Sequence, residues 1–205
     1  MRPRLPLSVI SGYLGAGKTT LINRLLAEGH GLRLLVMVND FGAINIDAAL
    51  LDSATEDTLT LSNGCVCCTM GADLFLAIGD VLDRADRPDH LVIEASGIAD
   101  PARIAQVALA EPELSYGGIV TVVDAQSFGA LSEDPQIGAQ VAGQVRVADI
   151  ICLSKSTGAD AALGLKLSIQ SGAQVFDLAE VESLAPILFG MEDRVVPQSL
   201  SLIHI

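Results

Sequence analysis

Eight consecutive residues near the start of the chain have the types and spacing of a phosphate-binding loop. They read Gly12-Tyr13-Leu14-Gly15-Ala16-Gly17-Lys18-Thr19. Glycines let the backbone wrap closely around an anion, so that several N–H groups point at one polyphosphate. A lysine and a hydroxyl at the end of such a loop reach the β- and γ-phosphates and Mg²⁺, respectively. We therefore predict a nucleoside triphosphate site formed by Gly12, Gly15, Ala16, Gly17, Lys18, Thr19 and Thr20.

A carboxylate at the end of an apolar segment supplies a second element of such a site. Residues 91–94 read Leu-Val-Ile-Glu, and Gly97 follows three positions after Glu94. In nucleotide switches an acid at a strand end holds Mg²⁺ through water, and a glycine at this spacing meets the γ-phosphate. Alone, the pattern also fits a solvated glutamate followed by a turn glycine. Because it follows a phosphate loop, it favours a Mg²⁺ site made by Thr19 and Glu94.

Three cysteines, Cys65, Cys67 and Cys68, lie within four positions after Gly64. A disulfide framework would spread its cysteines along the chain, whereas clustered thiolates can share one soft metal ion. Three ligands leave a fourth position open, which suits a metal that must leave again. Three reduced core cysteines or a redox pair remain alternatives. Cys152 falls in an apolar segment and is expected to be a small buried residue.

The spacing of apolar residues predicts the elements that position these groups. Nearly continuous apolar runs at 5–11, 34–38, 91–94, 119–123 and 150–153 are typical of strands buried on both faces. Amphipathic segments at 18–28, 72–84, 102–110, 135–147, 161–170 and 181–188 indicate helices between them. This alternation predicts an α/β fold: a P-loop NTPase three-layer sandwich, with a mostly parallel sheet and helices on both faces.

Composition limits the kinds of partner. The 205 residues include 25 Asp and Glu against 12 Lys and Arg, a net charge of −13, and aromatic residues are 3%. Such a surface argues against nucleic acids and anionic membranes as partners, and few rings are available for base stacking. No apolar run approaches the ~20 residues of a membrane span, and the first residues do not form a signal peptide. We expect a cytoplasmic protein.

Four blocks together resemble the CobW-type GTPases, which are described as zinc or cobalt metallochaperones. The blocks are the phosphate loop and residues 38–42 (Val-Asn-Asp-Phe-Gly), 64–69 and 94–101 (Glu-Ala-Ser-Gly-Ile-Ala-Asp-Pro). The resemblance implies a GTP-driven switch that delivers a transition metal to a client metalloprotein. It also places Asn39, Asp40 and Asp47 in a first switch region, with Asp40 near Mg²⁺, and Asp100 in a second. Without it, Asp40 and Asp47 would be exposed loop acids.

The chain departs from the base-recognition motif of GTPases, Asn-Lys-x-Asp, at the corresponding loop. Here Ser154-Lys155-Ser156-Thr157 follows the strand at 150–153. Ser154 and Lys155 can still contact the nucleotide. Thr157 cannot accept two N–H bonds from guanine as a carboxylate does, a pairing worth about 2–3 kcal/mol. Asp160 could substitute only in a remodelled loop, so the preference for GTP over ATP is weakened.

The family usually continues into a separate C-terminal domain. We expect residues 1–190 to form the nucleotide-binding domain and residues 191–205 a short tail, so that the chain is a short form, a fragment, or a protein whose client supplies the missing surface. A homodimer is also compatible with the sequence.

The leading hypothesis is a slow Mg²⁺-dependent GTPase with Lys18, Glu94, Gly97 and Asp100 in hydrolysis and zinc or another transition metal at the cysteines. One alternative is an ATP-dependent kinase or ATPase whose cysteines are structural or redox groups. Another is a protein that holds nucleotide or metal without turnover.

Overall fold

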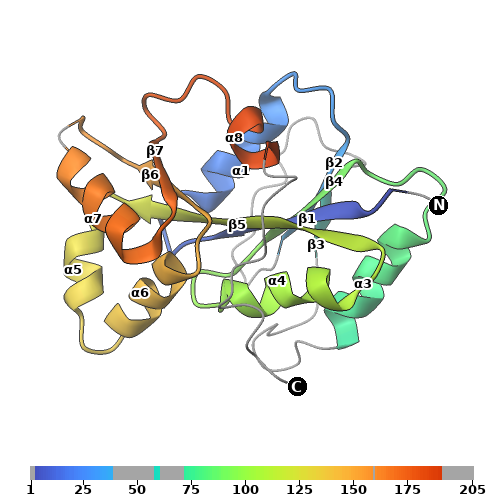
Figure 1. Cartoon of the computed structure of the whole chain (residues 1–205), viewed down its shortest axis with the longest axis horizontal. Coiled ribbons are helices and arrows are strands. Elements are labelled where there is room, and N and C mark those ends of the chain that lie inside the picture. Colours follow the sequence, from blue (N-terminus) through green and yellow to red (C-terminus); the bar gives the residue numbers. More distant parts are fainter. Residues whose placement is uncertain (1–2, 39–57, 61–71, 159, 191–205) are drawn as a thin grey trace.

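The computed structural model describes residues 3–38, 58–60, 72–158 and 160–190. In this part of the chain, seven strands form one sheet in the order β3-β2-β4-β1-β5-β6-β7, and every neighbouring pair is parallel (Figure 1). The strands are β1 (Leu5–Ser11), β2 (Leu34–Val38), β3 (Thr58–Thr60), β4 (His90–Glu94), β5 (Leu114–Asp124), β6 (Ile150–Ser154) and β7 (Gln174–Asp177). The predicted mostly parallel sheet is therefore confirmed, and it is parallel throughout the described strands.

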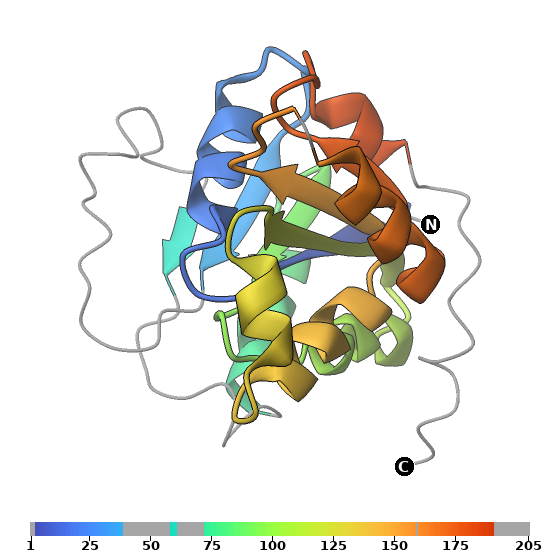
Figure 2. The ribbon, with the colours of Figure 1, turned by 90° about the vertical axis from the view of Figure 1, so that its left-hand side faces the viewer.

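Helices cover both faces of the sheet, as Figure 2 shows. They are α1 (Lys18–Ala27), α3 (Ala72–Leu82), α4 (Pro101–Ala110), α5 (Phe128–Glu133), α6 (Gly138–Arg146), α7 (Ala161–Ser171) and α8 (Ala185–Phe189). On one face α1 and α8 pack against the sheet. On the other face, α3 and α4 cover β2, β4 and β1, and α5, α6 and α7 cover the half of the sheet formed by β5, β6 and β7. Alternate residues of a strand face opposite layers, so Ile150 and Cys152 contact the α1 side while Ile151 and Leu153 contact the α6 side.

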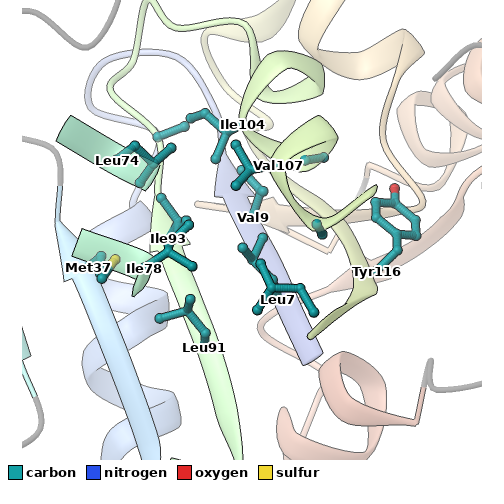
Figure 3. Close-up of a cluster of buried hydrophobic side chains, with 14 of the residues drawn as sticks. Leu7, Val9, Met37, Leu74, Ile78, Leu91, Ile93, Ile104, Val107 and Tyr116 are labelled. Atoms are coloured by element: carbon teal, nitrogen blue, oxygen red, sulfur yellow. The ribbon is translucent and has the colours of Figure 1, made fainter. Parts of the chain in front are cut away.

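The core is aliphatic and closely follows the predicted strands. Leu7 and Val9 of β1 and Leu91 and Ile93 of β4 pack with residues of α3 and α4 (Figure 3). Burial of this kind is the main favourable term in folding. It holds β1 between β4 and β5, so that the carboxyl ends of three neighbouring strands meet at one edge. None of the helices in the described ranges has the length and apolar character needed to cross a membrane.

Strand β5 begins five residues earlier than predicted, because Gly117 and Gly118 interrupt the apolar run without ending the strand. A Cβ at position 117 would lie 2.6 Å from the Ser8 hydroxyl oxygen, and Gly118 has φ of +101°. The register between β1 and β5 shifts at this point, between Leu7 and Ser8. A bulge of this kind needs a residue without a side chain.

The prediction of one helix over 135–147 is wrong for the first three residues, which are not helical. The Asp134 carboxylate accepts hydrogen bonds from the backbone N–H groups of Gln136 (2.8 Å) and Ile137 (3.2 Å). These bonds form a turn between α5 and α6, and side chains of this type compete with helix formation in this way. Helix α6 therefore starts at Gly138, and the short α5 precedes it. The prediction also missed β3 and β7, which are short, partly polar edge strands.

Candidate functional site

The predicted phosphate loop connects β1 to α1 in a tight turn. Gly12 has φ of +140°, and a Cβ there would lie 2.4 Å from the Val122 carbonyl oxygen, so only glycine fits. Gly15 and Gly17 also have positive φ, at +73° and +99°. Because Gly17 is the N-cap of α1, no capping side chain covers the N–H groups of the first turn. The loop and the positive end of the helix dipole therefore form an anion-binding environment.

Lys18 holds its ammonium group against this loop. Nζ donates hydrogen bonds to the carbonyl oxygens of Gly12 (2.9 Å) and Tyr13 (3.4 Å), and the residue is only 8% exposed. Burial lowers the pKa of Lys18, and the charge of Glu94 partly opposes that effect. The buried cation supplies local positive charge in an otherwise acidic chain.

Thr19 and Glu94 come together across the sheet edge, as predicted for a Mg²⁺ site. The Thr19 hydroxyl donates to Glu94 Oε1 at 3.3 Å. Glu94 ends β4, opposite Ile10 of β1, and the chain positions Thr19 in the first turn of the helix that follows β1. A hydroxyl and a carboxylate oxygen are hard ligands of the kind that Mg²⁺ prefers. The donor set therefore fits this ion.

Gly97 lies directly against the phosphate loop. A Cβ at this position would be 2.7 Å from the Leu14 backbone nitrogen. The absence of a side chain is thus what allows the turn after β4 to approach the loop. Asp100 has a structural role in this geometry: its Oδ1 accepts from the Ala102 N–H at 3.0 Å and caps α4. Its predicted part in catalysis stays a prediction.

The loop after β6 is joined to the phosphate loop by two side chains. The Ser154 hydroxyl donates to the Ala16 carbonyl at 2.6 Å. Lys155 donates to the Gly15 carbonyl at 3.0 Å and forms an ion pair with Asp124 at 2.7 Å. The structure thus places both predicted residues beside the phosphate loop.

Sequence reasoning missed Asp124, the last residue of β5. Burial opposes its ionisation, but hydrogen bonds from Lys155, Ser127 and the Gln126 N–H outweigh burial and lower the pKa of Asp124. The sequence does contain a signal for Asp124, because this residue, like Glu94, is an acid at the end of an apolar strand. Because carboxyl ends of neighbouring parallel strands meet, such an acid can reach the loop after β6.

Asp160 contributes to the same loop in a way that the sequence did not define. Its Oδ2 accepts hydrogen bonds from the Ser156 hydroxyl (3.1 Å) and from the Thr157 N–H (3.0 Å). The carboxylate is therefore drawn back onto the loop beside Thr157. The loop has an acid near the position where guanine-binding proteins use one, but it is engaged with the loop itself.

Of the remaining predicted residues, some lie in the described part of the chain and the others do not. Thr20 is exposed on α1. Cys152 is buried as predicted, and burial raises the pKa of its thiol to about 12. In the parts of the chain that the structure describes, no three His, Cys, Asp or Glu side chains gather to hold a metal. The predicted ligands Asp40, Cys65, Cys67 and Cys68, with Asn39 and Asp47, lie outside the described residues.

Known proteins are similar to this chain in sequence. A family model described as CobW/HypB/UreG, nucleotide-binding domain, matches residues 6–179. The zinc chaperone CobW of a Sinorhizobium species is 35% identical over 192 residues, covering 80% of this chain and 54% of that protein. The zinc chaperone YjiA of Escherichia coli K12 is 35% identical over 162 residues, covering 74% and 49%. The chain thus spans about half the length of these relatives.

Solved structures show the same fold. The Zn(II)-bound YjiA GTPase from E. coli superimposes with a TM-score of 0.67 at 28% identity, covering 95% of this chain and 64% of that one. The hydrogenase maturation factor HypB from Archaeoglobus fulgidus gives 0.55 at 19% identity, with coverage of 85% and 81%, which shows the fold alone. From the family model, the phosphate loop and the sheet that carries it, we conclude that the chain belongs to the CobW/HypB/UreG nucleotide-binding domain family.

Proposed function

We propose that this chain binds GTP with Mg²⁺ at the loop between β1 and α1 and hydrolyses it slowly. The observation that carries the proposal is the convergence of Lys18, Thr19 and Glu94 at one sheet edge beside a glycine loop. Relatives named as GTPases, such as YjiA, support it. Unassisted turnover on the order of 10⁻⁴ to 10⁻² s⁻¹ is the range of switch GTPases.

The proposed roles follow from the contacts of each side chain. Lys18 would exchange its bonds to the loop carbonyls for the β- and γ-phosphate oxygens, where its charge offsets theirs. Thr19 would bind Mg²⁺ directly and Glu94 through water, and the ion, when bound, would neutralise charge on the phosphates. The Gly97 N–H would meet the γ-phosphate, because the turn that carries it already lies against Leu14.

Guanine selection is the least constrained part of the proposal, and ATP is the second candidate. Thr157 lacks a carboxylate, and Asp160 is bonded to Ser156 and Thr157. Reading guanine would require Asp160 to leave those bonds, whereas Lys155 can lie against either purine. Competition between GTP and ATP for the Mg²⁺-loaded protein tests this: a preference for GTP of about 10-fold or more supports a guanine site, and a ratio near one favours a purine-tolerant NTPase.

We further propose that Cys65, Cys67 and Cys68 bind a zinc ion as cargo for a client metalloprotein. The relatives named as zinc chaperones support zinc over cobalt. Cys152 is not a candidate ligand, because its thiol is buried in the α1 layer and its pKa is raised to about 12. A metal ligand must be a thiolate.

The metal proposal is tested by titrating Zn²⁺ into reduced protein against a competing chelator, with and without Mg²⁺ and a non-hydrolysable GTP analogue. A tight site that disappears in a Cys65/Cys67/Cys68 triple serine variant, and whose affinity changes with nucleotide, supports a metal-handling switch. By linkage, the metal must then change nucleotide affinity by the same factor. Cys152→Ser is the matched control and should leave the zinc affinity unchanged.

Replacing Lys18 separates the two proposed sites. We expect Lys18→Ala to abolish measurable GTP hydrolysis, since it removes the only described ammonium group that bonds to the Gly12 and Tyr13 carbonyls. Zinc affinity in the absence of nucleotide should be unchanged. Phosphate release and chelator competition on the same folded sample check both. Loss of both activities would contradict separate sites.

A further inference from the structure

Two glutamines of α6 hold the turn that follows β4. Gln144 Nε2 donates to the carbonyl oxygens of Gly97 (3.0 Å) and Ala99 (3.2 Å), and Gln140 Nε2 donates to that of Ile98. Three consecutive carbonyls of the turn therefore accept amide hydrogens from one helix. The two glutamines are four residues apart, a spacing that puts both on the same helix face.

Helix α6 is a firm support for these donors. Gln144 is 3% exposed, and its own carbonyl accepts a hydrogen bond from the Thr121 hydroxyl of β5 at 3.1 Å. Val141 and Val145 of the same helix pack in the cluster formed with β6 and α7. The side-chain amide of Gln144 is thus fixed relative to the sheet. Its two N–H groups supply hydrogen bonds to two buried carbonyls that need a donor.

The opposite side of the turn rests on the phosphate loop. A Cβ on Gly97 would lie 2.7 Å from the Leu14 nitrogen, and the Ala99 N–H closes the turn onto the Ser96 carbonyl at 3.0 Å. In a trans peptide the N–H and C=O groups point in opposite directions. The carbonyls of Gly97, Ile98 and Ala99 are directed at α6, so the N–H groups of the residues that follow each of them point away from that helix. The Gly97 N–H belongs to the preceding peptide, so the glutamines act on it through the position of the turn.

We infer that Gln144, with Gln140, is a positioning residue that holds the 97–99 turn where it can respond to the third phosphate. This inference rests on the proposed function and concerns the same site. The γ-phosphate is the group proposed to meet this turn, and GDP lacks it, so we expect the glutamines to raise affinity for GTP and to leave affinity for GDP unchanged. Helix α6 thereby sets the discrimination between the two nucleotide states.

The test replaces the amide while keeping the shape of the side chain. In Gln144→Met the donor is lost and the volume is nearly retained. Titration with GDP and with a non-hydrolysable GTP analogue, both in Mg²⁺, should give about 10-fold weaker binding of the analogue and GDP affinity within about twofold of wild type. Gln140→Met should change the ratio in the same direction by less. Gln170→Met, at an exposed position of α7, should change neither affinity.

Several outcomes would overturn the inference. Equal weakening of both nucleotides would make Gln144 merely structural, and an unchanged ratio in both variants would give the glutamines no part in the discrimination. If circular dichroism shows that Gln144→Met does not fold, Gln140→Met decides alone, and an unchanged ratio there overturns the inference. A wild-type chain that binds neither nucleotide would overturn the proposed function and this inference together, which distinguishes that failure from the others.

Discussion

Gly12 is the point at which the backbone leaves β1, and its missing side chain determines how closely the loop lies to β5. With φ of +140° and a Cβ position 2.4 Å from the Val122 carbonyl oxygen, Gly12→Ala would combine backbone strain with a steric clash. We expect a loss of stability of about 2–4 kcal/mol and loss of nucleotide binding. Urea unfolding and nucleotide titration measure the two effects.

The matched control is Gly143→Ala, in the interior of α6. A Cβ at Gly143 meets no atom within 4 Å. Alanine is favoured over glycine in helices, so this change should stabilise the protein by about 0.5–1 kcal/mol. Equal stability of Gly12→Ala and wild type would mean that the loop moves away from β5 at little cost.

Residues whose position in the candidate site depends on local spacing could be predicted, whereas those whose position depends on topology could not. Lys18 and Thr19 follow a glycine loop, and Glu94 ends an apolar run, so the order of residue types was sufficient. Gln144 lies 47 residues after Gly97 in the chain, and its proposed role depends on α6 packing beside β5 and beside the turn that follows β4. No local pattern in the sequence distinguishes it from an ordinary helical glutamine.

Among the elements, α8 shows how side chains from elsewhere set a helix boundary. A helix was predicted over 181–188 and is observed from Ala185. The Glu28 carboxylate accepts from the Leu184 N–H (2.8 Å) and the Ala185 N–H (3.1 Å), and Arg24 donates to the carbonyls of Leu178 and Val181. These bonds hold the preceding residues as a loop. The periodicity of apolar residues carries no information about such partners.

The Glu28 contact predicts a measurable link between the end of α1 and the start of α8. Glu28→Ala removes the acceptor for the two N–H groups and for the Ser183 hydroxyl at 2.9 Å. Loss of a helix cap costs about 0.5–2 kcal/mol, and we expect a decrease in unfolding free energy within that range. Glu133→Ala, at an exposed position at the end of α5, should change stability by less than about 0.5 kcal/mol. Similar losses in the two variants would argue against the cap.

At the scale of the whole molecule, the two ends of the parallel sheet have different chemistry. At the carboxyl ends, Glu94 and Asp124 end their strands and Lys18 lies against the loop after β1, whereas the amino ends bury a neutral histidine. His90, the first residue of β4, is 3% exposed, and its Nε2 lies 2.8 Å from the Ser8 hydroxyl oxygen. Because that hydroxyl donates to the Gly117 carbonyl at 3.0 Å, Nε2–H of His90 is the donor to Ser8. The centroid of the Phe189 ring lies 4.6 Å from the centroid of the His90 ring.

Burial of His90 makes stability depend on pH. Burial lowers the pKa of His90 from 6.5 to about 4 in the folded protein. Between these values the unfolded chain binds a proton that the folded chain does not, so stability is full above pH 6.5 and falls as the pH decreases toward 4. The loss over this window is on the order of 3 kcal/mol. Urea unfolding at several pH values between 7.5 and 4.5 measures it.

A neutral replacement of His90 identifies the source of this pH dependence. In His90→Gln the side-chain amide can still donate to Ser8 but does not titrate, so the fall in unfolding free energy between pH 6.5 and 4.5 should be largely absent. Asp89 and Asp124 have lowered pKa values in the folded protein, so the stability they contribute is lost only below their unfolded pKa of about 4. The two windows are therefore separate. If the unfolding free energy of His90→Gln fell equally steeply between pH 6.5 and 4.5, the pH dependence would come from another group. Protonation of His90 would then cost the folded protein little free energy.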